Sequence, residues 1–195
     1  MKPEDALQTF VRDVELVVGS TDDEHEVTKR VAERLSALLA GGYRLPAEVL
    51  RGSDEHHVNY PLYIAADDSW SLACVVWNLG QRTPVHGHET WGVAGIYAGA
   101  ERELRYVKPT AADSPLTPAG EHVWERGQVT VCCTTDDDVH AVVAVGTEPA
   151  VGIHVYGGNI GTMERRLYDP ATGAVRWFVS GWDTPAADSS SLARK

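Results

Sequence analysis

The sequence predicts a mainly β protein, a sandwich or barrel covered by two or three N-terminal helices. Over the first 50 residues, apolar side chains recur every three or four positions, which is typical of helices that pack one face on a core. From about residue 58, short runs rich in Val, Tyr, Trp and Ile alternate with turn residues, which is typical of antiparallel strands. The 195 residues, 43% of them hydrophobic, suffice for one such domain.

The helices come first along the chain. An apolar stripe over residues 4–18 ends before Gly19, and a second stripe ends before Gly41. Thr21 and Glu24 have the spacing of a capping box, so we expect Thr21 to cap the second helix. A shorter helical stretch follows at Pro46. These stripes predict helices that cover one side of the core.

The strand region follows, and the segment 109–121 within it is expected to be a turn because it is rich in Pro, Gly and Asp. We expect a single domain over residues 1–182, with a helical cover at about 1–50 and a barrel at about 58–182. The small polar residues 183–195 are expected to form a flexible tail. The expected strands are 60–65, 71–77, 91–99, 101–107, 128–133, 140–145, 150–157, 165–169 and 174–182.

Composition excludes several classes of function. The net charge of −11 argues against nucleic acid and anionic membrane surfaces as partners, because both need a basic footprint. With no apolar stretch of ~20 residues and no signal-peptide core, the chain is expected to be cytoplasmic. The three cysteines, Cys74, Cys132 and Cys133, lack CxxC spacing and predict neither disulfides nor a cysteine zinc site. A soluble enzyme or small-molecule binder, monomeric or a small homo-oligomer, remains.

Histidines carry the functional signal. His86 and His88 stand two apart in a β-like segment, so their side chains share one face. Half-buried histidines satisfied by hydrogen bonds would have the same spacing. His140 opens a later strand, and strands distant in sequence meet inside a barrel, so a third imidazole can join the pair. Three imidazoles suit iron, copper, nickel and zinc alike. His154 and Tyr156, again two apart, also share a face.

The other four histidines are expected in solvent. His25 and His122 lie in polar surroundings. His56 and His57 lie in a charged stretch that favours a surface loop, although the rim of an active site is an alternative.

Several motifs together resemble one family. TPVHGH (83–88), WGV (91–93) and GIYAGAE (95–101) resemble the first motif of the cupin superfamily in its thiol dioxygenase branch. DVH (138–140) and IHVYGGNIG (153–161) resemble the second half of that branch. The likeness covers roughly residues 58–182 and is closest to bacterial 3-mercaptopropionate dioxygenases within the cysteine dioxygenase family. It implies a cupin (jelly-roll) β-barrel.

The resemblance also implies an activity and a site. His86, His88 and His140 match three ligands of a mononuclear Fe(II). Tyr156 matches a tyrosine whose hydroxyl faces the iron, and His154 matches the histidine that positions it. The implied reaction oxidises a small thiol, such as cysteine or 3-mercaptopropionate, to a sulfinate with O2, which makes the thiol and O2 the expected partners.

The substrate side departs from the family pattern. Cysteine dioxygenases hold the substrate carboxylate with an arginine upstream of the strand at 71–77, and the 3-mercaptopropionate relatives carry a glutamine there. Here Asn59 and Tyr60 are the nearest polar residues. Arg165 or Arg166 is a further candidate to bind the substrate carboxylate, although either can instead pair with Asp169. Trp77 matches a tryptophan that lines the substrate pocket in the family.

A further departure is Gly152, which stands two residues before His154, where such relatives tend to carry serine. Two alternative functions stay open at this point. One is a cupin oxygenase that acts on a non-thiol small molecule, and the other is a metal-binding cupin without turnover.

Overall fold

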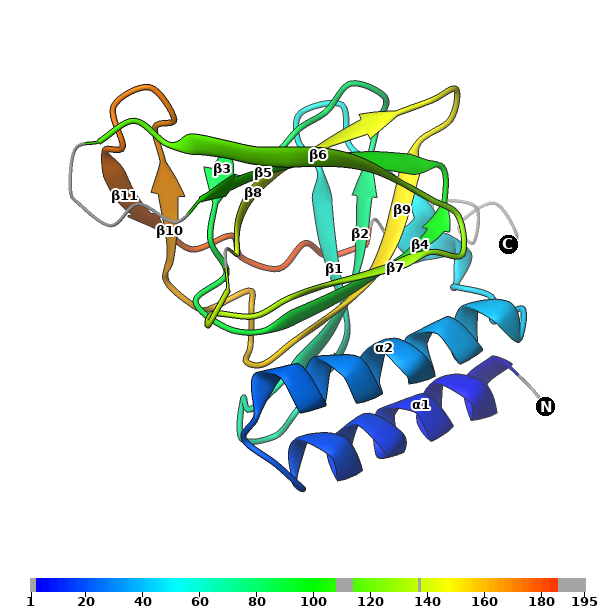
Figure 1. Cartoon of the computed structure of the whole chain (residues 1–195). Coiled ribbons are helices and arrows are strands. Elements are labelled where there is room, and N and C mark those ends of the chain that lie inside the picture. Colours follow the sequence, from blue (N-terminus) through cyan, green and yellow to red (C-terminus); the bar gives the residue numbers. More distant parts are fainter. Residues whose placement is uncertain (1–2, 108–113, 137, 186–195) are drawn as a thin grey trace.

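Two helices lie against a barrel made of two antiparallel sheets (Figure 1). The computed structural model describes residues 3–107, 114–136 and 138–185. The helices are α1 (Pro3–Val18) and α2 (Glu24–Ala40), followed by a single 3₁₀ turn at Ala47–Leu50. Both helices and the short turn occur where the apolar stripes predict them.

The strands divide between two sheets. In the first sheet, the order is β1 (Val58–Ile64), β2 (Ser71–Trp77), β9 (Ala150–Tyr156), β4 (Gly92–Ala98) and β7 (Val129–Cys132). In the second sheet, the order is β11 (Val175–Phe178), β10 (Arg165–Tyr168), β3 (Val85–His86), β8 (Val139–Val145), β5 (Ala100–Val107) and β6 (Thr117–Glu125).

The order of the strands β2 to β9 defines the fold. One sheet contains β2, β9, β4 and β7, and the other contains β3, β8, β5 and β6. Between β2 and β9, therefore, the chain crosses from one sheet to the other at every step except the β5–β6 hairpin. This order is that of the jelly roll found in cupins. The predicted fold class, a jelly-roll barrel with N-terminal helices, is confirmed.

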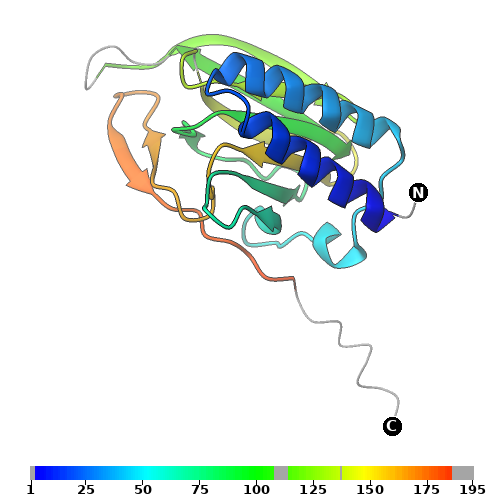
Figure 2. The same ribbon diagram turned by 90° about the horizontal axis from the view of Figure 1, so that it is seen from below.

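The helices cover the outer face of the first sheet (Figure 2). Val14 of α1 and Val31 and Leu35 of α2 are fully buried, in one apolar cluster with Val93 of β4 and Ile153 of β9. Since this cluster lies outside the barrel, the inner face of the same sheet is free to line a cavity. Among the described helices, none combines the length and hydropathy of a membrane-crossing segment.

The expected cap of the second helix is wrong. Asp23, directly before the first helical residue, accepts hydrogen bonds from the backbone N–H groups of His25 and Glu26. Thr21 instead accepts from the N–H of Asp23, and Glu24 bonds Thr134 across the molecule. An aspartate at the N-cap satisfies the free N–H groups as well as threonine does, and Asp23 stands two positions nearer the helix than Thr21.

The expected turn at 109–121 is partly wrong, because β6 begins at Thr117. Strand β6 is at the edge of its sheet, where Pro118 needs no ladder partner for its missing N–H. Gly120 has a φ of +133°, and the pairing register shifts beside it. Part of this turn, residues 108–113, and most of the expected tail, residues 186–195, lie outside the described residues.

Candidate metal centre

A cavity of about 320 Å³ lies between the two sheets of the barrel. Both sheets contribute inward-facing side chains to it, and the segments around residues 57 and 180 close one side. The lining residues that the sequence singles out are His86, His88, His140, His154, Tyr156, Trp77, Asn59 and Arg165. The barrel therefore collects at one place residues that span more than 100 positions of the chain.

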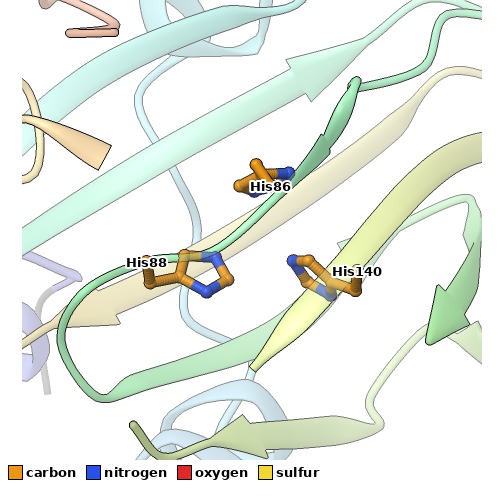
Figure 3. A group of neighbouring side chains, drawn as sticks. All are labelled: His86, His88 and His140. Carbon is orange, nitrogen blue, oxygen red and sulfur yellow. The ribbon is translucent and has the colours of Figure 1, made fainter. Parts of the chain in front are cut away.

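Three histidines converge in this cavity (Figure 3). His86 of β3 is paired in register with His140 of β8, and His88 follows β3 by two residues. The ring centroids are 4.8 Å apart for His86 and His140, 5.0 Å for His86 and His88, and 4.9 Å for His88 and His140. One nitrogen from each ring lies within 4.8 Å of the other two, which is close enough for one metal ion.

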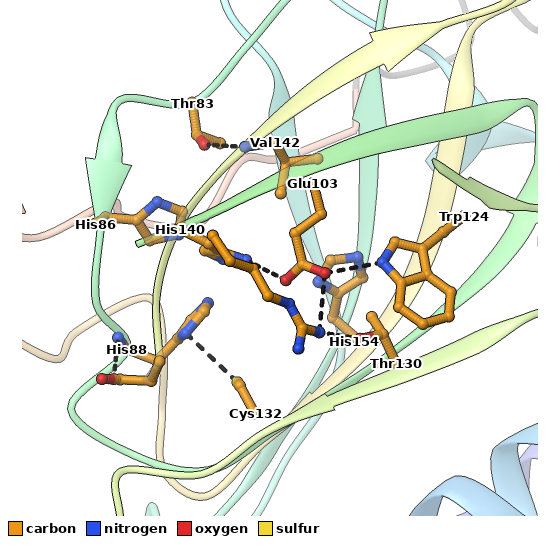
Figure 4. Close-up of polar contacts among 12 residues, drawn as sticks. Thr83, His86, His88, Glu103, Trp124, Thr130, Cys132, His140, Val142 and His154 are labelled. Carbon is orange, nitrogen blue, oxygen red and sulfur yellow. Dashed lines mark hydrogen bonds and ion pairs between the residues drawn. The ribbon is translucent and has the colours of Figure 1, made fainter. Parts of the chain in front are cut away.

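Each of these rings has a neighbour at Nδ1, and Figure 4 shows those of His88 and His140. Nδ1 of His86 lies 3.0 Å from the carbonyl oxygen of Pro84, and Nδ1 of His140 lies 2.7 Å from Oε1 of Glu103. Nδ1 of His88 lies 3.5 Å from Sγ of Cys132. When Nδ1–H donates to such a partner, Nε2 keeps its lone pair and the ring is held in place. The three Nε2 atoms thus fit a metal ion.

Burial keeps two of these imidazoles neutral. His86 and His88 are 8% and 4% exposed, and burial, together with the neighbouring His140, lowers the pKa of both well below the usual value. Because metal ligands must be deprotonated, a ring that is already neutral gives up no proton when the ion binds.

Glu103 of β5 holds His140, one of the three candidate ligands, through its Nδ1. Burial alone would raise the pKa of Glu103, but hydrogen bonds from His140, Trp124 and Arg105 outweigh it and lower the pKa to about 2. Sequence reasoning missed Glu103, and it missed the contact of Cys132 with His88. The alternation of Glu101 and Glu103 along β5 was the available signal, but alternating charges usually mark a solvated face.

His154 and Tyr156 form a second group, next to the histidine cluster. Nδ1 of His154 lies 2.8 Å from the hydroxyl oxygen of Tyr156, and the rings of Tyr156 and His88 are stacked with centroids 5.6 Å apart. Burial, with the nearby His140 and His57, lowers the pKa of His154 to about 3. Burial also raises the pKa of Tyr156. Near pH 7 both side chains are therefore neutral. One hydrogen bond joins them, and either Nδ1–H or the hydroxyl can be its donor.

Arg165 of β10 brings a positive charge into the same cavity. It is only 5% exposed, and its guanidinium lies 4.5 Å from the ring centre of Phe178. Within the described part of the chain, Nε and Nη2 of Arg165 have no hydrogen-bond partner, and neither does Oδ1 of Asn59. A buried guanidinium with free donors is suited to bind an anion.

Two of the expected substrate residues lie elsewhere. Tyr60 belongs to the core between the helices and the first sheet, and its hydroxyl donates to the carbonyl of Arg51. Arg166 forms an ion pair with Glu89, 2.6 Å away. Neither residue lines the cavity.

Four further histidines were expected in solvent. His57 does line the cavity, stacked on Trp77 with ring centroids 5.8 Å apart, so the expectation of a surface loop is wrong for it. His56 is exposed, as expected, although it also lies at the cavity's edge, 3.3 Å from Asp183. His25 and His122 are exposed, as expected.

Comparison with known proteins finds solved structures that are similar to part of this chain. No family model matches the sequence. A Klebsiella pneumoniae protein with a double-stranded β-helix domain is 15% identical, with a TM-score of 0.44, over 60% of this chain and 86% of that one. The cupin domain of Schizosaccharomyces pombe Cnp3 is 14% identical, with a TM-score of 0.44, over 60% and 69%. An oxalate oxidase bound to the substrate analogue glycolate is 14% identical, with a TM-score of 0.44, over 58% and 59%. At such low identity the likeness does not extend to activity.

Proposed function

We propose that the protein is an Fe(II)-dependent dioxygenase that oxidises a small thiol carboxylate to a sulfinate. The observation that carries this proposal is the content of one cavity. It combines three imidazoles, with no carboxylate in the ligand set that the described residues form, and a buried guanidinium with free donors. The resemblance of the sequence to thiol dioxygenases supports the same activity.

The charges of the cavity favour an anionic substrate. Three neutral ligands leave the full double charge of a ferrous ion uncompensated, and this favours a thiolate as a further ligand. When bound, the ion supplies the chemistry with O2, by which RSH and O2 give RSO2H and both oxygen atoms end on sulfur. A carboxylate on the same substrate finds the free donors of Arg165.

The remaining residues orient the reactants. The ring of Tyr156 stacks on that of His88, and its hydroxyl can donate a hydrogen bond into the cavity. His154 holds that hydroxyl through Nδ1. Trp77, which is 2% exposed between His57 and His154, forms an apolar wall that limits access of water.

Oxygen consumption by the Fe(II)-loaded protein tests this proposal. We expect 3-mercaptopropionate or cysteine to start oxygen uptake and to yield one sulfinate per O2. Cysteamine, a thiol without a carboxylate, is the matched control and should react poorly, because it offers nothing to Arg165. If no thiol starts uptake but another small molecule does, the protein is an oxygenase of a different class. If nothing does and metal is nevertheless bound, it is a binding protein.

A conservative substitution tests the role of the tyrosine. Tyr156→Phe removes only the hydroxyl that bonds His154, so we expect metal content to stay unchanged and kcat to fall about 10–100-fold. Metal analysis and steady-state kinetics measure the two effects. An unchanged kcat would exclude Tyr156 from the reaction.

A further inference from the structure

Two buried polar atoms border one small space beside Gly152. They are Oε1 of Glu101 and Nε2 of His154, and neither has a hydrogen-bond partner in the part of the chain that the structure describes. Both lie within 3.3 Å of the point where a Cβ at position 152 would stand. Glycine at 152 therefore leaves open a space that both atoms border.

Because both atoms are buried, leaving them without hydrogen bonds costs free energy. Glu101 is 4% exposed and His154 is 8% exposed, and polar groups at such depth are almost always hydrogen-bonded. Burial, with the neighbouring Glu103, raises the pKa of Glu101 to about 8, while burial lowers the pKa of His154 to about 3. Near pH 7 the pair thus consists of a carboxylic acid, which has a proton to donate, and a neutral imidazole.

We propose that Glu101 is a positioning residue whose carboxylic acid donates a hydrogen bond to Nε2 of His154. A small rotation of the Glu101 side chain, or one bridging water, closes the distance between the two atoms. With Nε2 accepting, the proton of the His154 ring lies on Nδ1 and is donated to the hydroxyl oxygen of Tyr156, 2.8 Å away. This chain of hydrogen bonds runs from Glu101 through His154 to Tyr156.

The direction in which these hydrogen bonds are donated matters for the reaction. With Nδ1–H as donor, the O–H of Tyr156 is released to donate into the cavity. In the opposite tautomer, the O–H of Tyr156 would donate to Nδ1 of His154, and the hydroxyl could then only accept a hydrogen bond from a group in the cavity. The catalytic consequence rests on the proposed function, whereas the tautomer of His154 does not.

Nitrogen NMR of the full-length protein tests the tautomer directly. With ¹⁵N-labelled histidine, in the metal-free protein and after addition of Zn²⁺, we expect His154 to carry its proton on Nδ1. Glu101→Gln keeps a donor and should keep this tautomer, whereas Glu101→Leu should move the proton to Nε2. A wild-type protein with the proton on Nε2 would overturn the proposal, and so would a tautomer that Glu101→Leu leaves unchanged. If the leucine variant does not fold, the wild-type spectrum alone decides.

Kinetics separates this proposal from the proposed function. We expect Glu101→Gln to keep kcat within about threefold and Glu101→Leu to lower it about 10–100-fold, with KM and metal content unchanged in both. A glutamine variant as slow as the leucine variant would refute a role as hydrogen-bond donor, and so would a leucine variant as fast as the wild type. If the wild-type protein oxidises no thiol, the proposed function fails, and the tautomer measurement still stands.

Discussion

Glu103 touches the ligand His140 with one carboxylate oxygen and Trp124 with the other. Glu103→Gln removes the charge that holds Nδ1–H of His140, and we expect affinity for divalent metal to fall about 10–100-fold. Competition with a chelator measures that affinity. Glu121→Gln, on the exposed face of β6, is the control and should bind metal like the wild type. Equal affinity in both variants would mean that Glu103 does not support the site.

Arg165 offers a second test at the scale of one residue. Arg165→Met keeps an unbranched apolar stem but removes the guanidinium, and with it the donors and the contact with Phe178. Loss of a charged hydrogen bond costs about 1.5–3 kcal/mol, so we expect KM for 3-mercaptopropionate to rise about 10–100-fold. Metal content should not change. If KM stays the same, the carboxylate binds elsewhere, and Asn59 is then the nearest polar candidate in the cavity.

The candidate site was predictable in part. The spacing of His86 and His88 predicts a shared face, and the motif around His140 supplies the third ring. The roles of Glu101 and Glu103 were not predictable. Their neighbours on the opposite face of the strand, Arg102 and Leu104, are one charged and one apolar residue, so the pattern does not tell which face is buried. Only the closed barrel shows that β5 turns its two glutamates inward.

At the scale of elements, the packing of α2 on β4 depends on a glycine. A Cβ at Gly95 would lie 2.9 Å from methyl groups of both Leu35 and Leu39, so the helix packs closely on the strand. We expect Gly95→Val to lower the free energy of unfolding by about 1–3 kcal/mol. Gly95→Ala should cost less, because one methyl group displaces only the ends of the two leucines. Urea unfolding measures both variants.

The position of Gly95 also predicts what should not change. The contact with α2 is on the outer face of the first sheet, whereas the cavity is on the inner face. Metal affinity of the folded Gly95→Val protein should therefore equal that of the wild type. A loss of metal affinity would show that the helices shape the cavity through the sheet.

Elements were more predictable than their boundaries. The segment 71–77 occurs as β2 with the predicted limits, because a run of apolar residues between turn residues leaves little choice. The predicted cap of α2 and the predicted start of β6 were wrong. Thr21 and Asp23 are both residue types that can cap a helix, and an edge strand tolerates Pro118 and Gly120.

At the scale of the whole molecule, the jelly roll places several ionisable groups in one buried interior. Burial lowers the pKa of His57, His86, His88 and His154, that of His154 to about 3. In the unfolded chain these rings take up protons near pH 6.5, so below that pH the unfolded state binds more protons than the folded state. Stability of the metal-free protein should therefore fall as the pH decreases from 6.5 toward 4.

Glu101 changes the stability with pH in the opposite direction. Its pKa rises from 4.5 to about 8 on folding, so between these values the folded state holds a proton that the unfolded state has lost. This group makes stability fall as the pH rises, and above about pH 7, where the histidines are largely neutral in both states, its effect is no longer opposed. We expect the free energy of unfolding, measured with urea in the presence of a chelator, to be highest at about pH 7. Toward pH 8 it should decrease by up to about 1.4 kcal/mol per pH unit. Glu101→Gln should abolish this decrease, and a decrease that persists in the variant would mean that another group causes it.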